Sequence, residues 1–448
     1  MLLVLRHRTF RHLFAAQVVA LVGTGLATVA LSLLAYDIAG DHAGPVLGTA
    51  LAIKMVAYVA LGPAAAVLAE RVPRRALLAG MDVIRAGVAL SLPFVTHIWQ
   101  IHLLVFALQA ASAIFTPTFQ ASIPEVLPDE RDYTQALSLS RMAYDLESLF
   151  SPALATLLLT VVSYRWLFTG TALGLIGSAL LVVSVALPAI RPVKRSGGLS
   201  AGAAFGTRLF RATPRLRALL ALDLAVAGAG AIVFVNTVVV VREVFGRPAS
   251  AVSLALGAYG AGSLLAALVL PRVLRRISDR RIMLVAGFVL PAVTAAVATA
   301  TGGAPAAWKW ALLLVCWAGI GAAGSAVLTP GGRVVRRSAA DADLPAAFAA
   351  QFSLSHGCWL VTYPLAGWLA AGAGVPVTAV VLAGISLAAV AAAAIMWPAV
   401  DPGVLPHVHT DLPAGHPHLV GAKPGTGGFE HGHAFVIDDC HAKWPSAA

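Results

Sequence analysis

Apolar runs of about 20 residues, the length that spans a lipid bilayer, recur along this chain from about residue 13 to residue 398. Charged residues make up only 11% of the 448 residues, whereas about 25% is usual for a soluble protein. None of the runs is followed by a small-residue cleavage site, so we expect no signal peptide and expect the first run to direct insertion. The sequence therefore predicts an all-α membrane protein.

The apolar runs predict about twelve transmembrane helices, at roughly 12–36, 45–69, 76–96, 98–121, 135–161, 164–187, 217–241, 249–270, 282–301, 308–329, 345–371 and 375–398. Lys and Arg are concentrated in every second loop, and the intervening loops keep only Arg165, Arg242, Arg247 and Lys309. Basic loops stay in the cytoplasm. We therefore expect a multi-pass protein of the bacterial inner membrane with both termini cytoplasmic.

A stretch rich in Gly, Ser and Arg separates six spans from six, which suggests a duplicated fold with two pseudo-symmetric six-helix halves. The expected parts are an N-terminal half at 1–190, a cytoplasmic linker at 191–216, a C-terminal half at 217–398 and a cytoplasmic tail at 399–448. The basic residues of the linker include Arg191, Lys194 and Arg195.

The halves also share weak local similarity. When Pro152 is aligned with Pro364, Tyr144 stands opposite His356. A basic turn, Arg74-Arg75-Ala-Leu-Leu, recurs as Arg280-Arg281-Ile-Met-Leu. Both matches support a duplication.

The segment AVLAERVPRRALL at 66–78 resembles the loop between the second and third spans of the major facilitator superfamily, Gly-x-Leu-Ala-Asp-Arg-x-Gly-Arg-Arg. Here Ala66 and Pro73 stand where that family has glycines, and Glu70 stands where it has aspartate. The opening FRHLFAAQVVALVGTGL and the later DVIR resemble the efflux branch that contains macrolide and siderophore exporters. A subset of that branch, similar to bacterial nickel-resistance exporters, carries a histidine-rich cytoplasmic tail, as this chain does.

The resemblance covers residues 1–400 and implies a gating role for the loop residues Glu70, Arg71, Arg74 and Arg75. An acid at a helix end beside arginines can hold two helices together in one gating state and release them in the other. The alternative is that the arginines only anchor the topology.

Charged or ionisable residues at membrane depth are expensive and usually face a cavity or a partner. The candidates for transport or coupling are Lys54, Arg141, Asp145, Glu147, Asp223 and His356. The four-residue spacing of Arg141 and Asp145 lets them pair with each other, which favours a structural role for both. Asp223 could titrate in the cavity or pair with a loop arginine.

Glu147 and His356, one from each half, form the preferred substrate or proton-coupling pair. The alternative for His356 is a hydrogen-bonded interior histidine. Cys358 could join it at a metal ion only across an unwound segment, because residues i and i+2 diverge on a helix.

Signals for other function classes are weak. Gly319-Ile-Gly321-Ala-Ala-Gly324 matches a dinucleotide-binding pattern by letter, but it lies inside an apolar span and indicates close helix packing instead. We find no nucleophile elbow, Walker loop or zincin motif, so we expect no enzyme activity and no required cofactor. The net charge of +11 follows the loop alternation, which does not indicate nucleic-acid binding. We expect a monomer.

The tail contains seven histidines: His407, His409, His416, His418, His431, His433 and His441. Six of them form three His-x-His pairs, and in an extended chain residues i and i+2 point the same way. Imidazole suits nickel, cobalt, zinc or copper. The Pro- and Gly-rich stretch 402–433 indicates a tail without a fold of its own, so its sites would be loose. The end of the tail is apolar enough to dock on the cytoplasmic face.

These observations predict a proton-coupled exporter that works by alternating access, with lipid, protons and a small substrate as its partners. A divalent transition metal ion such as nickel or cobalt is the leading substrate, because the tail could collect ions beside the cavity. One alternative is an exporter of an organic drug or siderophore with a regulatory metal-binding tail. Another is a membrane-anchored metal sensor.

Overall fold

The computed structural model describes residues 2–40, 43–188, 199–399, 404–410, 412–413, 415–425, 427–438, 440–441 and 443–445. The first half contains α1 (Arg8–Ala39), α2 (Ala43–Leu61), α3 (Ala64–Arg71), α4 (Arg74–Ser91), α5 (Ile98–Val126), α6 (Glu130–Leu159) and α7 (Tyr164–Val183). The second contains α8 (Leu199–Ala212), α9 (Pro214–Val239), α10 (Ala249–Val273), α11 (Asp279–Thr301), α12 (Ala307–Arg336), α13 (Leu344–Ala373) and α14 (Val375–Met396). Each of the twelve expected spans contains a helix, so the all-α prediction is confirmed.

Apolar content explains most of these helices. In the described part of the chain, nine helices are long and apolar enough to cross a membrane. The pair α2 and α3, which meet at a bend of 52°, is long and apolar enough for a tenth if the two helices form one broken span. The helices α6 and α13 do not reach this level of hydropathy. They correspond to the fifth and eleventh spans, which carry Glu147 and His356, and both pack against the opposite half.

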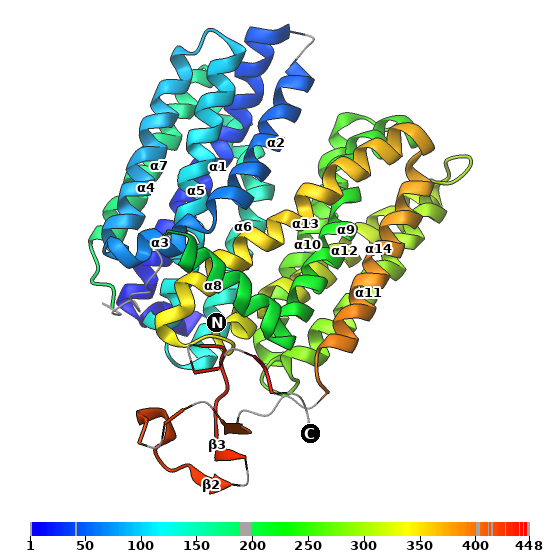
Figure 1. Ribbon diagram of the computed structural model, residues 1–448. Helices are drawn as coiled ribbons and strands as arrows, with labels where there is room; N and C mark the ends of the chain where they lie inside the picture. Colours follow the sequence, from blue (N-terminus) through cyan, green and yellow to red (C-terminus); the bar gives the residue numbers. More distant parts are fainter. Residues whose placement is uncertain are drawn as a thin grey trace.

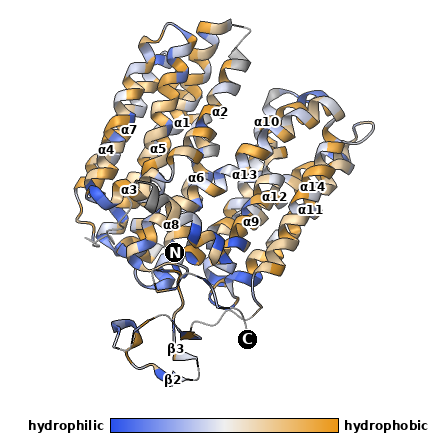
Figure 2. Ribbon diagram, in the orientation of Figure 1, coloured by the Kyte–Doolittle hydropathy of each residue, from blue (hydrophilic) through white to orange (hydrophobic). Residues whose placement is uncertain are grey.

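The helices form two bundles that meet at one end and diverge toward the other (Figure 1). The end where they meet also lies beside the N-terminal segment and the C-terminal tail, and it is called the tail side below. Hydrophilic residues gather at this end and in the tail, while the helix shafts are mostly hydrophobic (Figure 2). A bilayer around the shafts accounts for that distribution.

Close helix packing explains the glycine pattern in α12. A Cβ on Gly321 would overlap the backbone of Tyr259 in α10, and a Cβ on Gly262 would overlap the backbone of Ala318. Glycine at these positions lets the two helix backbones approach each other. The helix has no preceding strand, so it has no dinucleotide-binding context.

The linker contains a helix, α8, which lies across the tail side of both bundles (Figure 1). Gly206 of α8 packs directly on the backbone of Ala346 in α13. Phe205 is buried in one cluster with Ala65 and Ala66 of α3, and α8 contacts α3 directly. The linker residues Arg191, Lys194 and Arg195 lie outside the described residues. Thus α8 connects the two halves by contact as well as by sequence.

The tail folds, contrary to the expectation of a segment without structure. Strands β1 (Leu405–His409), β2 (Lys423–Gly425) and β3 (Gly428–His433) form an antiparallel sheet in the order β1-β3-β2. Gly428 opens β3 with φ of 139°, and a Cβ there would overlap the His409 carbonyl. Composition favoured disorder, but cross-strand pairing and docking on the bundle supply contacts that composition does not report.

Candidate functional site

Lys54 of α2 is close to both residues expected to carry coupling. Its ammonium group interacts electrostatically with both Glu147 and His356. The Glu147 carboxylate and the Ser151 side chain pack against Gly25 of α1, where a Cβ would overlap both. Among the described residues no hydrogen bond or ion pair joins Glu147 to His356. The two groups therefore share a cation rather than contacting each other.

His356 is held on α13 by its own helix and by aromatic neighbours. Its Nδ1 lies 2.7 Å from the Phe352 carbonyl oxygen, and its ring stands edge-on to Tyr58 with 4.8 Å between centroids. This Nδ1 contact leaves Nε2 free to accept or bind. The Cys358 Sγ donates to the Leu354 carbonyl in the same way. Because α13 is continuous here, the unwound segment that a joint His356–Cys358 metal site needs is absent.

Arg141 and Asp145 form the ion pair that their spacing allows, with 3.1 Å between nitrogen and oxygen. The pair also reaches the opposite half through Ser263 of α10. The Arg141 guanidinium donates to the Ser263 hydroxyl at 3.0 Å, and that hydroxyl donates to Asp145 at 2.7 Å. The pair therefore also joins the two halves at mid-depth.

Asp223 is buried in the second half without the loop arginine that was considered for it. The Gln351 side-chain amide donates to its Oδ2 at 2.7 Å, and Oδ1 has no hydrogen-bond partner among the described residues. A buried carboxyl with a neutral partner is costly to ionise. Asp223 is therefore suited to carry a proton.

Aromatic side chains surround the same depth of the bundle. Phe234 is 49% exposed, and its ring stands 5.2 Å from Tyr259 and 5.9 Å from Trp359. Trp359 is three residues from His356 and therefore shares its side of α13. Tyr144, the pseudo-symmetric partner of His356, is 40% exposed. These flat apolar faces could contact an organic molecule.

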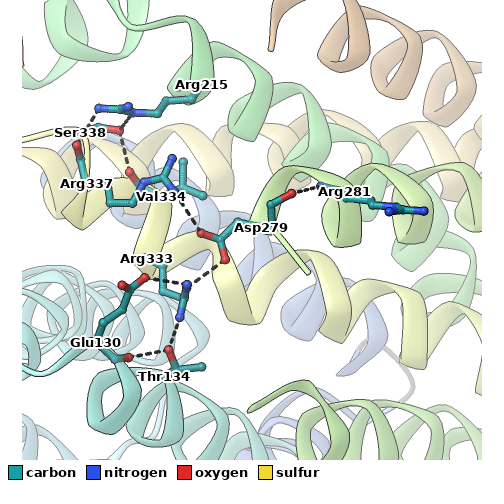
Figure 3. Close-up of polar contacts among 10 residues, drawn as sticks. Glu130, Thr134, Arg215, Asp279, Arg281, Arg333, Val334, Arg337 and Ser338 are labelled. Atoms are coloured by element: carbon teal, nitrogen blue, oxygen red, sulfur yellow. Dashed lines mark hydrogen bonds and ion pairs between the residues drawn. The ribbon is translucent and has the colours of Figure 1, made fainter. Parts of the chain in front are cut away.

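On the tail side, one guanidinium joins the two halves (Figure 3). Arg333 of α12 binds Asp279 at 2.9 Å and reaches across to Glu130 of α6 at 2.6 Å. It also donates to the Thr134 hydroxyl. Arg337 lies 3.7 Å from the second Asp279 oxygen. These five residues are the Arg333 network below.

Next to this network, Arg336 donates to the Pro128 carbonyl at 2.6 Å. The described hydrogen bonds and ion pairs between the halves all lie on the tail side or at mid-depth. The structure is therefore closed on the tail side.

The expected gating loop contributes less than this network. Arg74 pairs with buried Glu125 of α5, inside the first half. Glu70, Arg71 and Arg75 make no ion pair in the described part of the chain. Sequence reasoning missed Asp279 and Arg333 as site residues. The available signal was the repeated basic turn, which places Asp279 just before Arg280 and Arg281.

Six of the seven tail histidines converge into one cluster: His407, His409, His418, His431, His433 and His441. Strand register builds most of it, because His407 stands opposite His431. The Nε2 atom of His407 lies 3.0 Å from that of His409 and 3.0 Å from that of His441. The Nε2 atom of His418 lies 3.2 Å from those of His433 and His441. The seventh, His416, instead accepts from the His418 backbone amide.

Hydrogen bonding between neutral imidazole rings cannot account for this convergence. A ring nitrogen can donate one hydrogen bond or accept one, never both. His407 and His441 each place Nδ1 on an oxygen, the Leu405 carbonyl and the Asp438 carboxylate respectively. Nδ1 is then the protonated nitrogen, so two Nε2 lone pairs face each other at 3.0 Å. A cation between them removes this conflict.

The spacing of the cluster also fits a metal ion. Four ligand nitrogens about 2.0–2.1 Å from one zinc ion stand about 3.3 Å apart, close to the separations seen here. The Asp438–His441 contact, 2.8 Å long, is the carboxylate–histidine arrangement that orients metal ligands. An open pocket of about 790 Å³, lined partly by His418, His431 and His433, lies beside the cluster and gives an ion access.

The cluster also resists protonation. The pKa of His431 is lowered to about 4, mainly because the ring is removed from water and also because neighbouring imidazoles carry charge when protonated. The pKa of His441 is lowered to about 4 for the same first reason, although Asp438 opposes the shift. The pKa values of His409 and His418 are also lowered, mainly by burial. Neutral imidazole is the form that binds a metal ion.

Comparison with known proteins supports the architecture. A family model described as Major Facilitator Superfamily matches residues 13–308 and 220–416. The "Uncharacterized MFS-type transporter YfiS" of Bacillus subtilis is 26% identical over 301 residues, which cover 65% of this chain and 69% of that one. "Macrolide efflux protein A" of Streptococcus pyogenes is 26% identical over 184 residues, 40% of this chain and 45% of that protein.

Solved structures share the fold at low sequence identity. The E. coli fucose:proton symporter FucP has a TM-score of 0.67 at 13% identity and covers 87% of this chain and 98% of its own. A bacterial homologue of the iron transporter ferroportin, in an outward-facing state with soaked iron, has a TM-score of 0.65 at 14% identity and covers 86% and 98%. These likenesses concern the fold alone.

Proposed function

Because this chain belongs to the Major Facilitator Superfamily, whose model matches most of its length, we propose that it is a proton-coupled exporter that works by alternating access. Its leading substrate is a divalent transition metal ion such as nickel or cobalt. The protein lies in a bacterial inner membrane, and the tail side faces the cytoplasm because the basic loops lie there. The Arg333 network is then the closed cytoplasmic gate.

The proposed coupling uses ionisable groups at membrane depth in both halves. Glu147 and Asp223 can each bind a proton, and Lys54 stands close enough to act on Glu147 and on His356. Protonation of Glu147 would remove a charge that Lys54 otherwise balances. The proton affinity of these groups can therefore differ between the two access states, and coupling requires such a difference.

The metal substrate rests on one observation, the six-histidine cluster on the cytoplasmic side. In the described part of the chain, the groups of histidine, cysteine and acidic residues placed to hold an ion are all in this cluster. It stands beside the entrance that an inward-open state would offer. The cluster can concentrate ions there before they enter the transport path.

A second candidate function is export of an organic compound. The specific observation in its favour is the aromatic surround of Phe234, Tyr259 and Trp359, which suits a flat apolar molecule. The relatives named for macrolide efflux point the same way over part of the chain. In that case the tail is a metal-responsive regulator.

Everted inner-membrane vesicles separate these candidates. With an imposed proton gradient, vesicles containing the full chain should accumulate nickel or cobalt, and those containing Glu147→Gln should not. Truncation after Asp401 should reduce uptake most at low ion concentration. Gradient-driven uptake of a macrolide without metal uptake would support the second candidate. Uptake of neither, with metal still bound to the tail, would support a membrane-anchored sensor.

A further inference from the structure

Asp438 joins the histidine cluster to the linker helix by hydrogen bonds. The Asp438 carboxylate contacts His441 Nδ1 at 2.8 Å and accepts from the His441 backbone amide at 2.8 Å. The Asp438 carbonyl accepts from the Arg208 guanidinium of α8 at 3.1 Å. An ion that fixes the His441 ring therefore also fixes the group that binds Arg208.

A second connection runs from the end of the tail to α9. The Trp444 ring lies over the Arg215 guanidinium, 5.1 Å from the ring centroid. Arg215 is only 6% exposed, and it donates to the Arg337 carbonyl at 2.6 Å and to the Ser338 hydroxyl at 2.8 Å. Figure 3 shows Arg215 beside the Arg333 network. The tail therefore contacts the residue that holds the end of α12.

The apolar part of the tail is part of the same interface. Phe435 and Ile437 are 5% and 0% exposed and belong to the buried cluster that includes Phe205 of α8 and Ala65 of α3. This cluster crosses from one half to the other on the cytoplasmic side. The tail is therefore docked at the junction of the halves in the closed state of the gate.

We propose that a transition metal ion bound by the six-histidine cluster fastens the tail to α8 and Arg215 and thereby stabilises the closed cytoplasmic gate. A ligand shifts an equilibrium toward the state that binds it better. The cluster that is assembled here belongs to a docked tail and a closed gate, so metal favours both. The tail is then a metal-dependent latch on the transport cycle, whatever substrate the core carries.

Hydrogen exchange on the full chain in lipid nanodiscs, with and without nickel or zinc, tests this latch. In the native chain, metal should slow amide exchange in the tail, in α8 and in the cytoplasmic end of α12. At a free metal concentration 100 times the Kd, slowing of up to about 100-fold is expected. The double variant His407→Ala with His418→Ala, which lacks the two histidines common to both four-histidine groups, should lose both responses. The matched control His416→Ala, in the same tail but outside the cluster, should keep both.

A double variant, Arg208→Gln with Trp444→Ala, separates metal binding from the latch. It should bind metal and protect the tail sheet, but metal should no longer slow exchange in α12. Protection of α12 in this variant equal to that of the native chain would overturn the proposed contacts. Protection of the tail alone in the native chain would overturn the latch, and no metal response at all would overturn the site.

The latch rests on the proposed function in one respect only, which is that the six-histidine cluster binds a transition metal. Loss of vesicle transport with an intact exchange response would leave the latch standing. Normal metal transport without that response would leave the exporter standing.

Discussion

Arg333 joins the two halves on the closed tail side through a single guanidinium. Its two acidic partners differ in burial. The Asp279 side chain is 2% exposed, whereas that of Glu130 is 62% exposed. Solvent weakens the Glu130 pair to roughly 0.2–1 kcal/mol. Removing Arg333 instead leaves a buried carboxylate with the longer Arg337 contact alone, which costs more.

We therefore expect Arg333→Met to open the gate more than Glu130→Gln does. Glu130→Gln should change the ratio of open to closed gate by only about 1.4- to 5-fold, as its exposed pair allows. Arg333→Met should change it more than 10-fold. The readout is the rate at which a thiol reagent modifies a cysteine placed at Ser138, which is buried one turn along α6 and lies outside the network, compared with its rate in the unfolded chain. Equal effects of the two substitutions would contradict the ranking by burial.

At the proposed coupling residues, we expect Glu147→Gln and His356→Ala each to abolish proton-driven export without loss of protein. Neither residue has an ion pair in the described structure, and Lys54, which interacts with both, is only partly buried, so we expect both substituted proteins to fold. Arg141→Met should instead lower protein abundance, because Asp145 would lose its partner. Transport in everted vesicles, normalised to membrane protein, measures the first effect. Normal proton-driven export by Glu147→Gln would remove that residue from the mechanism.

At the scale of elements, the tail sheet shows how register builds a site from separated pairs. Residues i and i+2 of one strand share a face, and antiparallel pairing brings the equivalent face of the next strand beside it. His407 and His409 from β1 thus meet His431 and His433 from β3. His418 and His441 come from outside the strands and complete the cluster.

Without metal, the tail sheet should lose stability as the pH falls from about 6.5 to about 4. Imidazoles of the unfolded tail have a pKa of about 6.5, whereas the folded tail lowers the pKa of His431 and His441 to about 4. The unfolded tail binds more protons in this window, so acid favours it. Exchange of the amides in 404–433, corrected for the intrinsic effect of pH and measured with a chelator, reports this. Replacing His431 with Gln should weaken the dependence, and a flat profile would contradict it.

At the scale of the whole molecule, the charge distribution sets the orientation in the membrane. Basic loops lie at the same end as α8 and the tail, and translocating them across the membrane is unfavourable. We expect reporter fusions at residues 200 and 448 to report the cytoplasm and a fusion at residue 305 to report the periplasm. A periplasmic signal from the fusion at 448 would contradict an even number of spans.

Much of the fold could be predicted from sequence because the bilayer imposes it. The length of the apolar runs predicted the spans, including α6 and α13, which also carry polar residues that contact the opposite half, such as Arg141 and Ser353. The residue type and spacing of the tail histidines marked them as candidate metal ligands, and the structure brings six of them together. The pairing of Arg141 with Asp145 followed from helix geometry. Each of these features is set by residues that are close together in the sequence.

Tertiary structure alone decided which distant residues meet. It joined Arg333 to Glu130, connected Arg141 and Asp145 to Ser263, and left His416 out of the cluster. It also folded a tail that composition marked as disordered, because β1 and β3 pair and Phe435 and Ile437 are buried against the bundle. The physical reason is that such contacts depend on strand register and helix packing between segments far apart in sequence, which local pattern does not specify.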